Sequence, residues 1–193
     1  ARILSMSRFG ERTLAKDGIP STYIPHGIDP RTFRPTPSGF RAERGIPDDA
    51  FLVTINAANN DNAPSRKAWF EMLVALKAVM DLHPDIRAHL HTDVKRPKGM
   101  DIPSLVTLLG MDRARITAAD PMDYRLGAYD DASVAAMYTA SDVLLATSRG
   151  EGFGLAVPEA MACGTPAIVT DFSAQPELVG DTGWRVAWEP EFD

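Results

Sequence analysis

Two glutamates in the last third of the chain, Glu151 and Glu159, lie on either side of a turn that contains Gly152 and Gly154. Glycine permits positive φ and a close backbone approach, and the free amides at Gly154 and Leu155, with the positive end of a helix dipole, would bind an anion such as a diphosphate. Because Glu151 precedes the expected helix and Glu159 lies within it, the carboxylates would face different parts of one ligand, such as the ribose and the sugar of a nucleotide sugar. The alternative is a tight turn in which Glu151 only complements the helix dipole.

A second candidate is the polar loop at residues 59–67, which ends in Arg66 and Lys67 where a helix is expected to begin. Cations oppose the helix dipole at that end, so local stability disfavours them unless an anion offsets their charge. Lys67 would then bind a phosphate as a point charge. The alternative is a solvated pair of surface cations.

A third candidate is the loop at residues 124–131, which contains Tyr124 and Tyr129. Tyr129 is predicted to flank a nucleotide base and so to take part in donor binding. The alternative is a tyrosine-rich surface turn. The acids Asp130 and Asp131 are better explained as caps of the next helix.

Other chemistries find no support in the residues. The four histidines have no metal-binding spacing, and no Asp-x-Asp occurs, so neither a metal nor a cofactor is expected. Ser, His and Asp form no nucleophile-elbow motif. With 20 basic and 26 acidic side chains, the net charge of −6 offers no footprint for nucleic acid.

The single cysteine, Cys163, rules out an internal disulfide and indicates a reducing compartment. No run reaches the roughly 18 apolar residues of a transmembrane helix, and the amino end lacks the apolar stretch of a signal peptide. A cytoplasmic protein is therefore expected, in which any membrane contact is peripheral. The first residues enter an element without a start signal and residues 189–193 are polar, so we expect a piece of a longer chain.

The elements that must position these residues alternate between strand and helix. Residues 51–55 form a continuous apolar and β-branched run, which predicts a strand buried on both faces. A helix before Pro84 is predicted from apolar residues at spacings of three and four, namely Trp69, Leu73, Leu76 and Met80. Further strands are predicted at residues 22–24, 86–90, 115–118, 143–146 and 167–170, further helices at 8–16, 102–109, 132–140, 155–162 and 176–179, and a last short segment at 184–186.

This alternation predicts an α/β fold, with a Rossmann-like parallel sheet, right-handed crossovers and helices on both faces. Ligands of such sheets bind beyond the carboxyl ends of the strands, so a ligand is expected at the loops of residues 56–67, 119–131 and 147–154. Turn chemistry at residues 25–30, with Pro35 and Pro37 following, predicts a linker.

The strings S-R-G-E-G-F-G-L at residues 148–155 and E-A-M-A-C-G-T-P at residues 159–166 resemble the Glu-x7-Glu signature of glycosyltransferase family 4, the retaining enzymes of the GT-B architecture. Residues 24–29 and 33–35 are similar to the link between the two domains of that family. Met137, Tyr138 and residues 141–143 match the segment before the signature. The resemblance spans nearly the whole chain.

The resemblance implies one half of a GT-B architecture. Residues 1–37 would be the end of the amino-terminal domain and the linker, and residues 38–193 the carboxy-terminal donor-binding domain. The donor would be a UDP- or GDP-sugar, and a hexose would be transferred with retention and without a required metal. Possession of only one domain implies that the chain alone is inactive, and membrane association would come through the missing domain. The acceptor, the base and the sugar stay open.

The resemblance also implies a role for each candidate side chain. Glu151 would contact hydroxyls of the donor sugar, and Glu159 would hold the ribose. Lys67 with Arg66 would neutralise the diphosphate leaving group. The remaining contacts would come from amides of the turn, at Gly152, Phe153, Gly154 and Leu155.

One departure from the family pattern concerns Ala57 and Ala58, which stand where the family commonly has an arginine. Either Arg66 replaces that arginine or the stabilisation of the diphosphate is weaker. A non-catalytic nucleotide-sugar-binding domain therefore remains an alternative, as does a GT-B-like sugar-nucleotide epimerase or phosphorylase.

Overall fold

The computed structural model describes residues 2–61 and 65–187. Residues 62–64, in the middle of the polar loop at residues 59–67, lie outside the described residues, as do residues 188–193, which include the polar stretch at residues 189–193.

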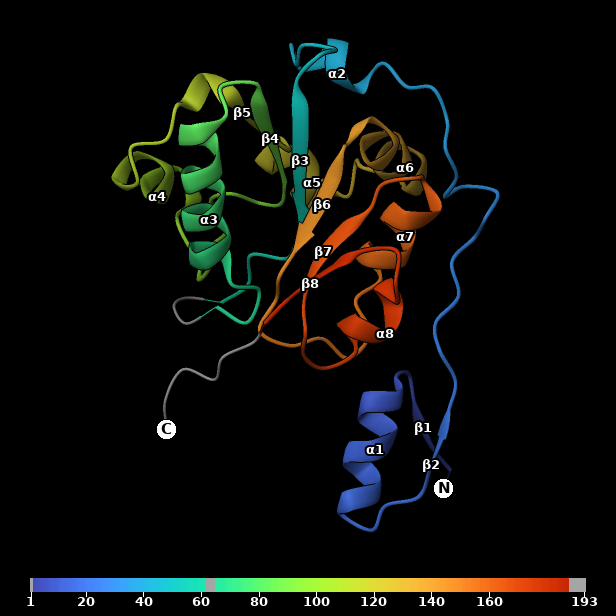
Figure 1. Cartoon of the computed structure of the whole chain (residues 1–193). Coiled ribbons are helices and arrows are strands. Elements are labelled where there is room, and N and C mark those ends of the chain that lie inside the picture. Colours follow the sequence, from blue (N-terminus) through green and yellow to red (C-terminus); the bar gives the residue numbers. More distant parts are fainter. Residues whose placement is uncertain (1, 62–64, 188–193) are drawn as a thin grey trace.

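The described residues form an α/β fold in which strands and helices alternate (Figure 1). The strands are β1 (Ile3–Ser5), β2 (Ser21–Tyr23), β3 (Phe51–Asn56), β4 (Ile86–His91), β5 (Ile116–Ala118), β6 (Val143–Ala146), β7 (Ala167–Thr170) and β8 (Trp184–Val186). The helices are α1 (Arg8–Lys16), α2 (Phe40–Glu43), α3 (Trp69–Leu82), α4 (Ile102–Leu108), α5 (Pro121–Leu126), α6 (Asp131–Ala140), α7 (Ala156–Ala162) and α8 (Gln175–Val179), and a 3-10 turn covers Arg113–Arg115. The predicted strands and helices are confirmed, with ends that differ by one residue or less.

The loop predicted at residues 119–131 is wrong in part, because α5 lies inside it. Asp120 caps this helix through its side chain, which accepts hydrogen bonds from the amides of Met122 and Asp123 at 2.8 and 3.0 Å. Pro121 occupies the first turn, and Gly127 ends the helix with a φ of 68°. These residues are ordinary signals for the start and end of a helix, and they explain why the segment is helical rather than a loop.

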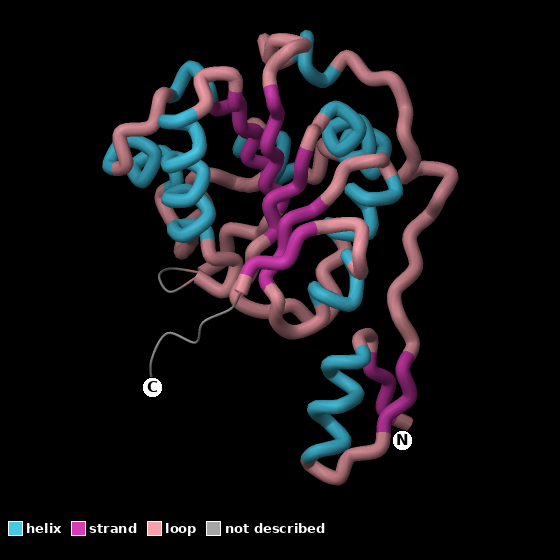
Figure 2. Tube along the Cα trace, in the orientation of Figure 1, coloured by secondary structure: helices cyan, strands magenta, loops and turns pink. Residues whose placement is uncertain are grey.

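Six strands form one parallel sheet in the order β5-β4-β3-β6-β7-β8, which crosses the middle of the molecule (Figure 2). From β3 the chain proceeds to β4 and β5 on one side, and it then returns to place β6 on the other side of β3. A crevice forms beyond the carboxyl ends of the strands at such a switch point. The loops that follow β3 and β6 therefore meet at this edge.

The core has two parts, one on each face of the sheet. Val53 and Ile55 of β3 pack with α3 and α4 on one face, whereas Leu52 packs with α6 and α7 on the other. Leu52 and Ile55 are fully buried, which confirms a strand covered on both sides. The predicted α/β sheet with helices on both faces is thus observed.

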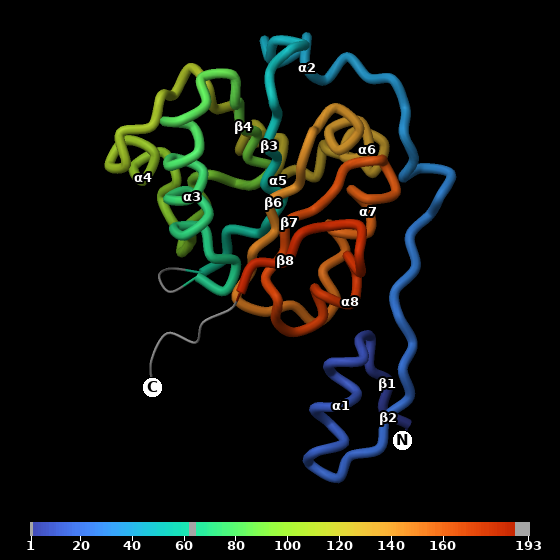
Figure 3. The backbone as a smooth tube through the Cα atoms, viewed as in Figure 1, coloured from blue at the N-terminus to red at the C-terminus, as the bar shows by residue number. Residues whose placement is uncertain are grey.

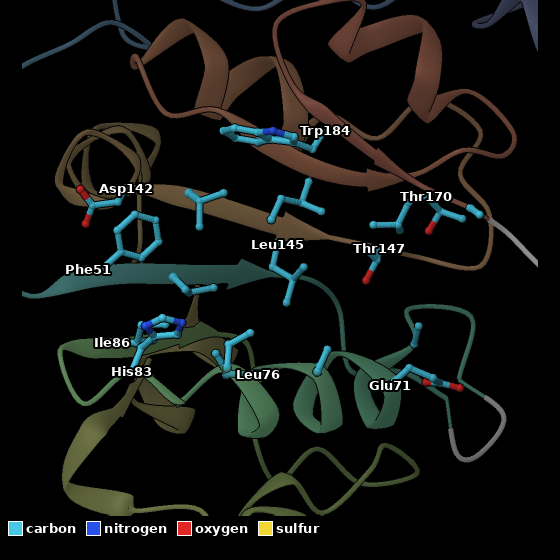
Figure 4. A pocket seen from close by; sticks show the side chains of 18 of the residues that line it. Phe51, Glu71, Leu76, His83, Ile86, Asp142, Leu145, Thr147, Thr170 and Trp184 are labelled. Atoms are coloured by element: carbon cyan, nitrogen blue, oxygen red, sulfur yellow. The ribbon is translucent and has the colours of Figure 1, made fainter. Parts of the chain in front are cut away.

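The face that carries α3 is incompletely covered beyond β3. An apolar cavity of about 1170 Å³ opens there between α3 and the strands β6, β7 and β8, and Leu145 and Trp184 are among the residues that line it (Figure 4). Trp184 is 58% exposed. Among the described helices, only α3 contributes residues to the lining of this cavity, although parallel sheets are usually covered on both faces.

The first residues form a small separate unit in which β1 and β2 pair in parallel beside α1. From β2, residues 24–39 run in an extended path beside α6 and α7 to α2 (Figure 3). Hydrogen bonds from Thr36 to Thr139 and from Ser38 to Ala136 hold this path to α6.

Glu177 of α8 fastens α1 to the main body of the molecule. Its carboxylate accepts hydrogen bonds from the backbone amides of Arg8 (2.8 Å) and Phe9, which are free donors in the first turn of α1. The ring of Phe9 meets that of Phe172 with centroids 5.4 Å apart. Because α1 has no buried residue of its own, these contacts carry much of its attachment.

We expect Glu177→Ala to release the small unit without unfolding the sheet. A hydrogen bond to a charged group contributes about 1.5–3 kcal/mol, which corresponds to roughly tenfold or more faster amide exchange in residues 3–23. Hydrogen exchange monitored by mass spectrometry measures this directly. Glu11→Ala, which removes only the exposed pair with Arg8, is the matched control. Equal exchange in the two variants would contradict the assignment.

Candidate functional site

A cavity of about 480 Å³ lies at the switch point, beyond the ends of β3 and β6 and against the start of α7. The loops after the two strands are tied together there, because the Arg149 amide donates to the Arg66 carbonyl at 2.9 Å. Met6 and His26 reach the cavity from the amino-terminal segment. The cavity is lined by candidate residues from the sequence, namely Lys67, Glu151, Gly152, Phe153, Gly154, Leu155 and Glu159.

Glu151 forms an ion-pair cluster with the two cations of the β3 loop. It contacts Lys67 Nζ through Oε1 and Arg66 through Oε2, the latter at 3.1 Å. Its amide donates to Ser173 Oγ at 2.9 Å, which fixes its place in the loop. Burial acts to raise the pKa of the Glu151 carboxyl, but hydrogen bonds from Lys67 and Ser148 and the charges of Lys67 and Arg66 together outweigh it, and the net pKa is lowered. The anion expected to offset the two cations is therefore a side chain of the protein itself.

The turn at residues 152–155 lines the cavity and has free backbone donors. Gly154 has a φ of 94°, which an L side chain rarely adopts, so glycine is required at this position. Among the described residues, the amides of Gly152, Phe153, Gly154 and Leu155 have no hydrogen-bond acceptor. The Phe153 side chain is buried, and its ring meets that of His26 at 5.1 Å. Four free amides at one edge can bind an anion or sugar oxygens.

Glu159 enters the cavity from α7 and contacts a buried tyrosine that sequence reasoning had not placed in the site. Tyr138 of α6 is fully buried, and its hydroxyl donates to Glu159 Oε2 at 3.3 Å. Asn56, at the end of β3, donates to the same hydroxyl at 2.7 Å. Burial raises the pKa of Glu159 to about 7. The only sequence signal for Tyr138 was its membership of the segment that matches the family before the signature.

Gln175 is a second lining residue that the sequence did not indicate. It is 1% exposed, and its amide nitrogen donates to the Ala146 carbonyl. Its Oε1 has no hydrogen-bond partner among the described residues. A buried acceptor of this kind is costly unless a donor reaches it, so Gln175 adds a free acceptor to the cavity wall.

Two predicted residues lie outside the set that lines the cavity. Arg66 is half exposed and contacts Glu151 and the Gly150 carbonyl, so it reaches the site only through the ion-pair cluster. Tyr129 packs against His91 at 5.0 Å, and its hydroxyl accepts from the Asp120 amide at 2.8 Å. Both assignments stay predictions. Ala57 and Ala58, at the place of the arginine common in the resembled family, line the cavity directly.

Two other polar residues of the candidate loops, Asn59 and Asp130, have structural roles. Asn59 is 1% exposed and clamps residues 93–100, because its side chain donates to the carbonyls of Asp93 and Met100 and accepts from the Met100 amide. Asp130 caps α6 by accepting from the Ser133 amide at 2.8 Å, as predicted.

Two buried histidines on β4, His89 and His91, make the stability of the fold sensitive to acid. Burial lowers the pKa of His89 to about 3, with a further contribution from the charges of His91 and Arg44. Burial and Arg44 lower the pKa of His91 to about 4. The folded protein keeps both rings neutral, whereas the unfolded chain binds protons below about pH 6.5. Stability contributed by the neutral rings is therefore present above pH 6.5 and is lost as the pH falls from there towards 4 and 3.

We expect the free energy of unfolding to fall by roughly 1 kcal/mol per buried histidine between pH 6 and pH 5. In His89→Leu this loss should be smaller by about that amount, because one of the two rings is gone. Urea unfolding at both pH values measures the difference. His83→Leu, at an exposed position, should keep the wild-type dependence. A His89→Leu protein that loses as much stability as wild type would contradict the prediction.

Among the residues described, no cluster of three or more His, Cys, Asp or Glu side chains could hold a metal ion. None of the described helices is long and apolar enough to cross a membrane.

Parts of the chain are similar to a known protein family and to several known proteins. Residues 99–191 match the family model described as glycosyl transferases group 1. The D-inositol 3-phosphate glycosyltransferase of Actinosynnema mirum is 31% identical over 180 residues, which cover 90% of this chain and 41% of that protein. The family model and the relatives support a glycosyltransferase group 1 domain of the GT-B superfamily in this chain.

One further relative by sequence and one solved structure are similar to this chain. The GDP-mannose-dependent alpha-(1-6)-phosphatidylinositol dimannoside mannosyltransferase of Mycobacterium tuberculosis is 29% identical over 87% of this chain and 40% of that protein. The structure of sucrose-phosphate synthase from Thermosynechococcus elongatus superposes with a TM-score of 0.75 and 26% identity, over 95% of this chain and 44% of that one. The chain thus spans less than half the length of these relatives.

Proposed function

We propose that the chain is the donor-binding half of a retaining glycosyltransferase of family 4, which transfers a hexose from a UDP- or GDP-sugar. The observation that carries the proposal is one cavity, at the switch point of a GT-B-type sheet, that is lined by Lys67, Glu151, Glu159 and a turn with four free amides. The two relatives are a glycosyltransferase and a mannosyltransferase by name, which supports the same reaction class.

In this proposal each group of the cavity has a chemical task. Glu159 accepts hydrogen bonds from the ribose, and Glu151 accepts them from the transferred sugar. As the bond between the anomeric carbon and the phosphate oxygen breaks, the acceptor oxygen bonds that carbon from the same face, and its proton passes to the leaving phosphate. Lys67 and the amides of residues 152–155 stabilise the charge that develops on the diphosphate. The proposal needs no metal or cofactor, and it places the reaction in the cytoplasm, with membrane contact confined to the amino-terminal domain.

Titration calorimetry of the intact protein with UDP, GDP and ADP tests the proposal. We expect one of the three nucleotides to bind at micromolar to millimolar concentration and to lose affinity in Glu159→Ala, which removes the carboxylate that is proposed to hold the ribose. Glu71→Ala removes a carboxylate that lies outside this cavity and should bind as wild type does. If none of the nucleotides or their sugars binds, the proposal fails.

A non-catalytic binding domain is the second candidate, and the presence of Ala57 and Ala58 in the cavity wall favours it, because no arginine reaches the diphosphate from there. Such a domain would bind nucleotide sugar without releasing nucleoside diphosphate, whatever acceptor is added. Release assays with the bound donor separate the two candidates, and formation of an altered sugar from donor alone would reveal an epimerase.

A further inference from the structure

A row of hydrogen bonds links side chains of β3, α6 and α7 at the cavity, and each side chain in it donates to the next. Asn56 Nδ2 can only donate, so the Tyr138 oxygen accepts at 2.7 Å. The hydroxyl proton of Tyr138 is then free to point at Glu159 Oε2, at 3.3 Å. Three side chains from three different elements therefore form one ordered sequence of donors, which ends at a carboxylate in the cavity.

The same arrangement leaves one oxygen of Glu159 for a ligand. Oε2 is occupied by Tyr138, whereas Oε1 has no hydrogen-bond partner among the described residues. Glu159 lines the cavity, while Tyr138 does not and has no exposed surface. The tyrosine thus acts on a ligand only through the glutamate.

We propose that Tyr138, aligned by Asn56, is a positioning residue that holds Glu159 with one oxygen presented to the cavity and favours its ionised form. A donor aimed at a carboxylate stabilises the anion, and the anion is the form that accepts two hydrogen bonds from a vicinal diol. Burial opposes ionisation at this position, so the tyrosine offsets part of that cost. The expectation that the ligand is the ribose of a nucleotide rests on the proposed function.

Tyr138→Phe removes one hydroxyl and keeps the ring that fills the core. In the ligand-free protein, carbon-detected NMR of the Glu159 carboxyl should show its titration midpoint moved upward by about one pH unit. Tyr23→Phe, which removes the hydroxyl of a tyrosine that does not line the cavity, should leave the Glu159 midpoint unchanged. An unmoved midpoint in Tyr138→Phe overturns the proposal, whether or not any nucleotide binds.

Calorimetry with the nucleoside diphosphate that binds wild type gives the second readout. With a midpoint raised by about one pH unit from neutrality, the ratio of the variant Kd to the wild-type Kd should be about fivefold larger at pH 7 than at pH 9. In a Glu159→Gln background this pH dependence should vanish, because no carboxylate remains to titrate. A ratio that is the same at both pH values indicates a merely structural tyrosine and overturns the proposal.

The two readouts separate this inference from the proposed function. If UDP, GDP and ADP all fail to bind wild type, the nucleotide site is wrong, and the Glu159 titration still decides the role of Tyr138. If a nucleotide binds and the Glu159 midpoint does not respond to Tyr138→Phe, the nucleotide site stands and the inference fails.

Discussion

Lys67→Ala is expected to reduce release of nucleoside diphosphate from the donor sugar by about a hundredfold or more, the usual loss when one group that stabilises developing charge is removed. Among the described residues, Lys67 is the only lysine or arginine that lines the cavity. Its removal also leaves the Glu151 carboxylate, 11% exposed, with only the half-exposed Arg66 as a charge partner. Steady-state assays on the full-length protein measure the loss.

Two further variants identify the cause of that loss. Lys77→Ala removes the same charge from α3, at a position outside the cavity, and should retain wild-type rates. Lys67→Arg keeps the charge and should recover part of the rate, although its planar fork does not reproduce a point charge. Wild-type rates in Lys67→Ala would remove Lys67 from the reaction.

Trp69→Ala is expected to destabilise the fold by about 3–5 kcal/mol, the usual cost of emptying a buried aromatic site. Trp69 is fully buried at the start of α3, and its indole nitrogen donates to the Ala58 carbonyl at 3.2 Å. The variant would therefore both open a cavity in the core and release the loop that carries Ala58 into the ligand cavity. Urea unfolding gives the magnitude.

Phe70→Ala is the matched control, because Phe70 is the next residue of the same helix and is 42% exposed. A surface substitution of this kind usually changes stability by less than about 0.5 kcal/mol. If the two variants differ by less than about 1 kcal/mol, the core described here does not depend on Trp69.

The strands of the sheet were predictable because each is marked by its own local sequence pattern. Continuous apolar runs such as β6 need no information from elsewhere in the chain, and they were placed to the residue. By contrast, α5 was missed although Asp120 and Gly127 mark its ends, because the two tyrosines nearby drew the interpretation towards a ligand loop. The helix-capping signals were thus given less weight than the expectation of a ligand-binding loop.

The loops that line the cavity were predictable, but the contacts between their side chains were not. The loops that carry Lys67 and Glu151 were recognised, but their ion pair joins residues 84 positions apart and exists only because β6 lies beside β3. The link between Asn56, Tyr138 and Glu159 depends in the same way on three elements that meet in the folded chain. Spacing along the sequence carries no information about such contacts, and a buried tyrosine looks like any other core residue.

The pairing of Glu151 with Lys67 has a consequence for how an anion reaches the cavity. The cation is already neutralised at short range, and the chain as a whole carries a charge of −6, so little attractive field extends into solvent. Association with an anionic ligand is then not accelerated by electrostatic steering, and its rate should not fall as the ionic strength rises. Under the proposed function, the positive charge would become available only after the ligand has entered and the Glu151 carboxylate has exchanged Lys67 for sugar hydroxyls.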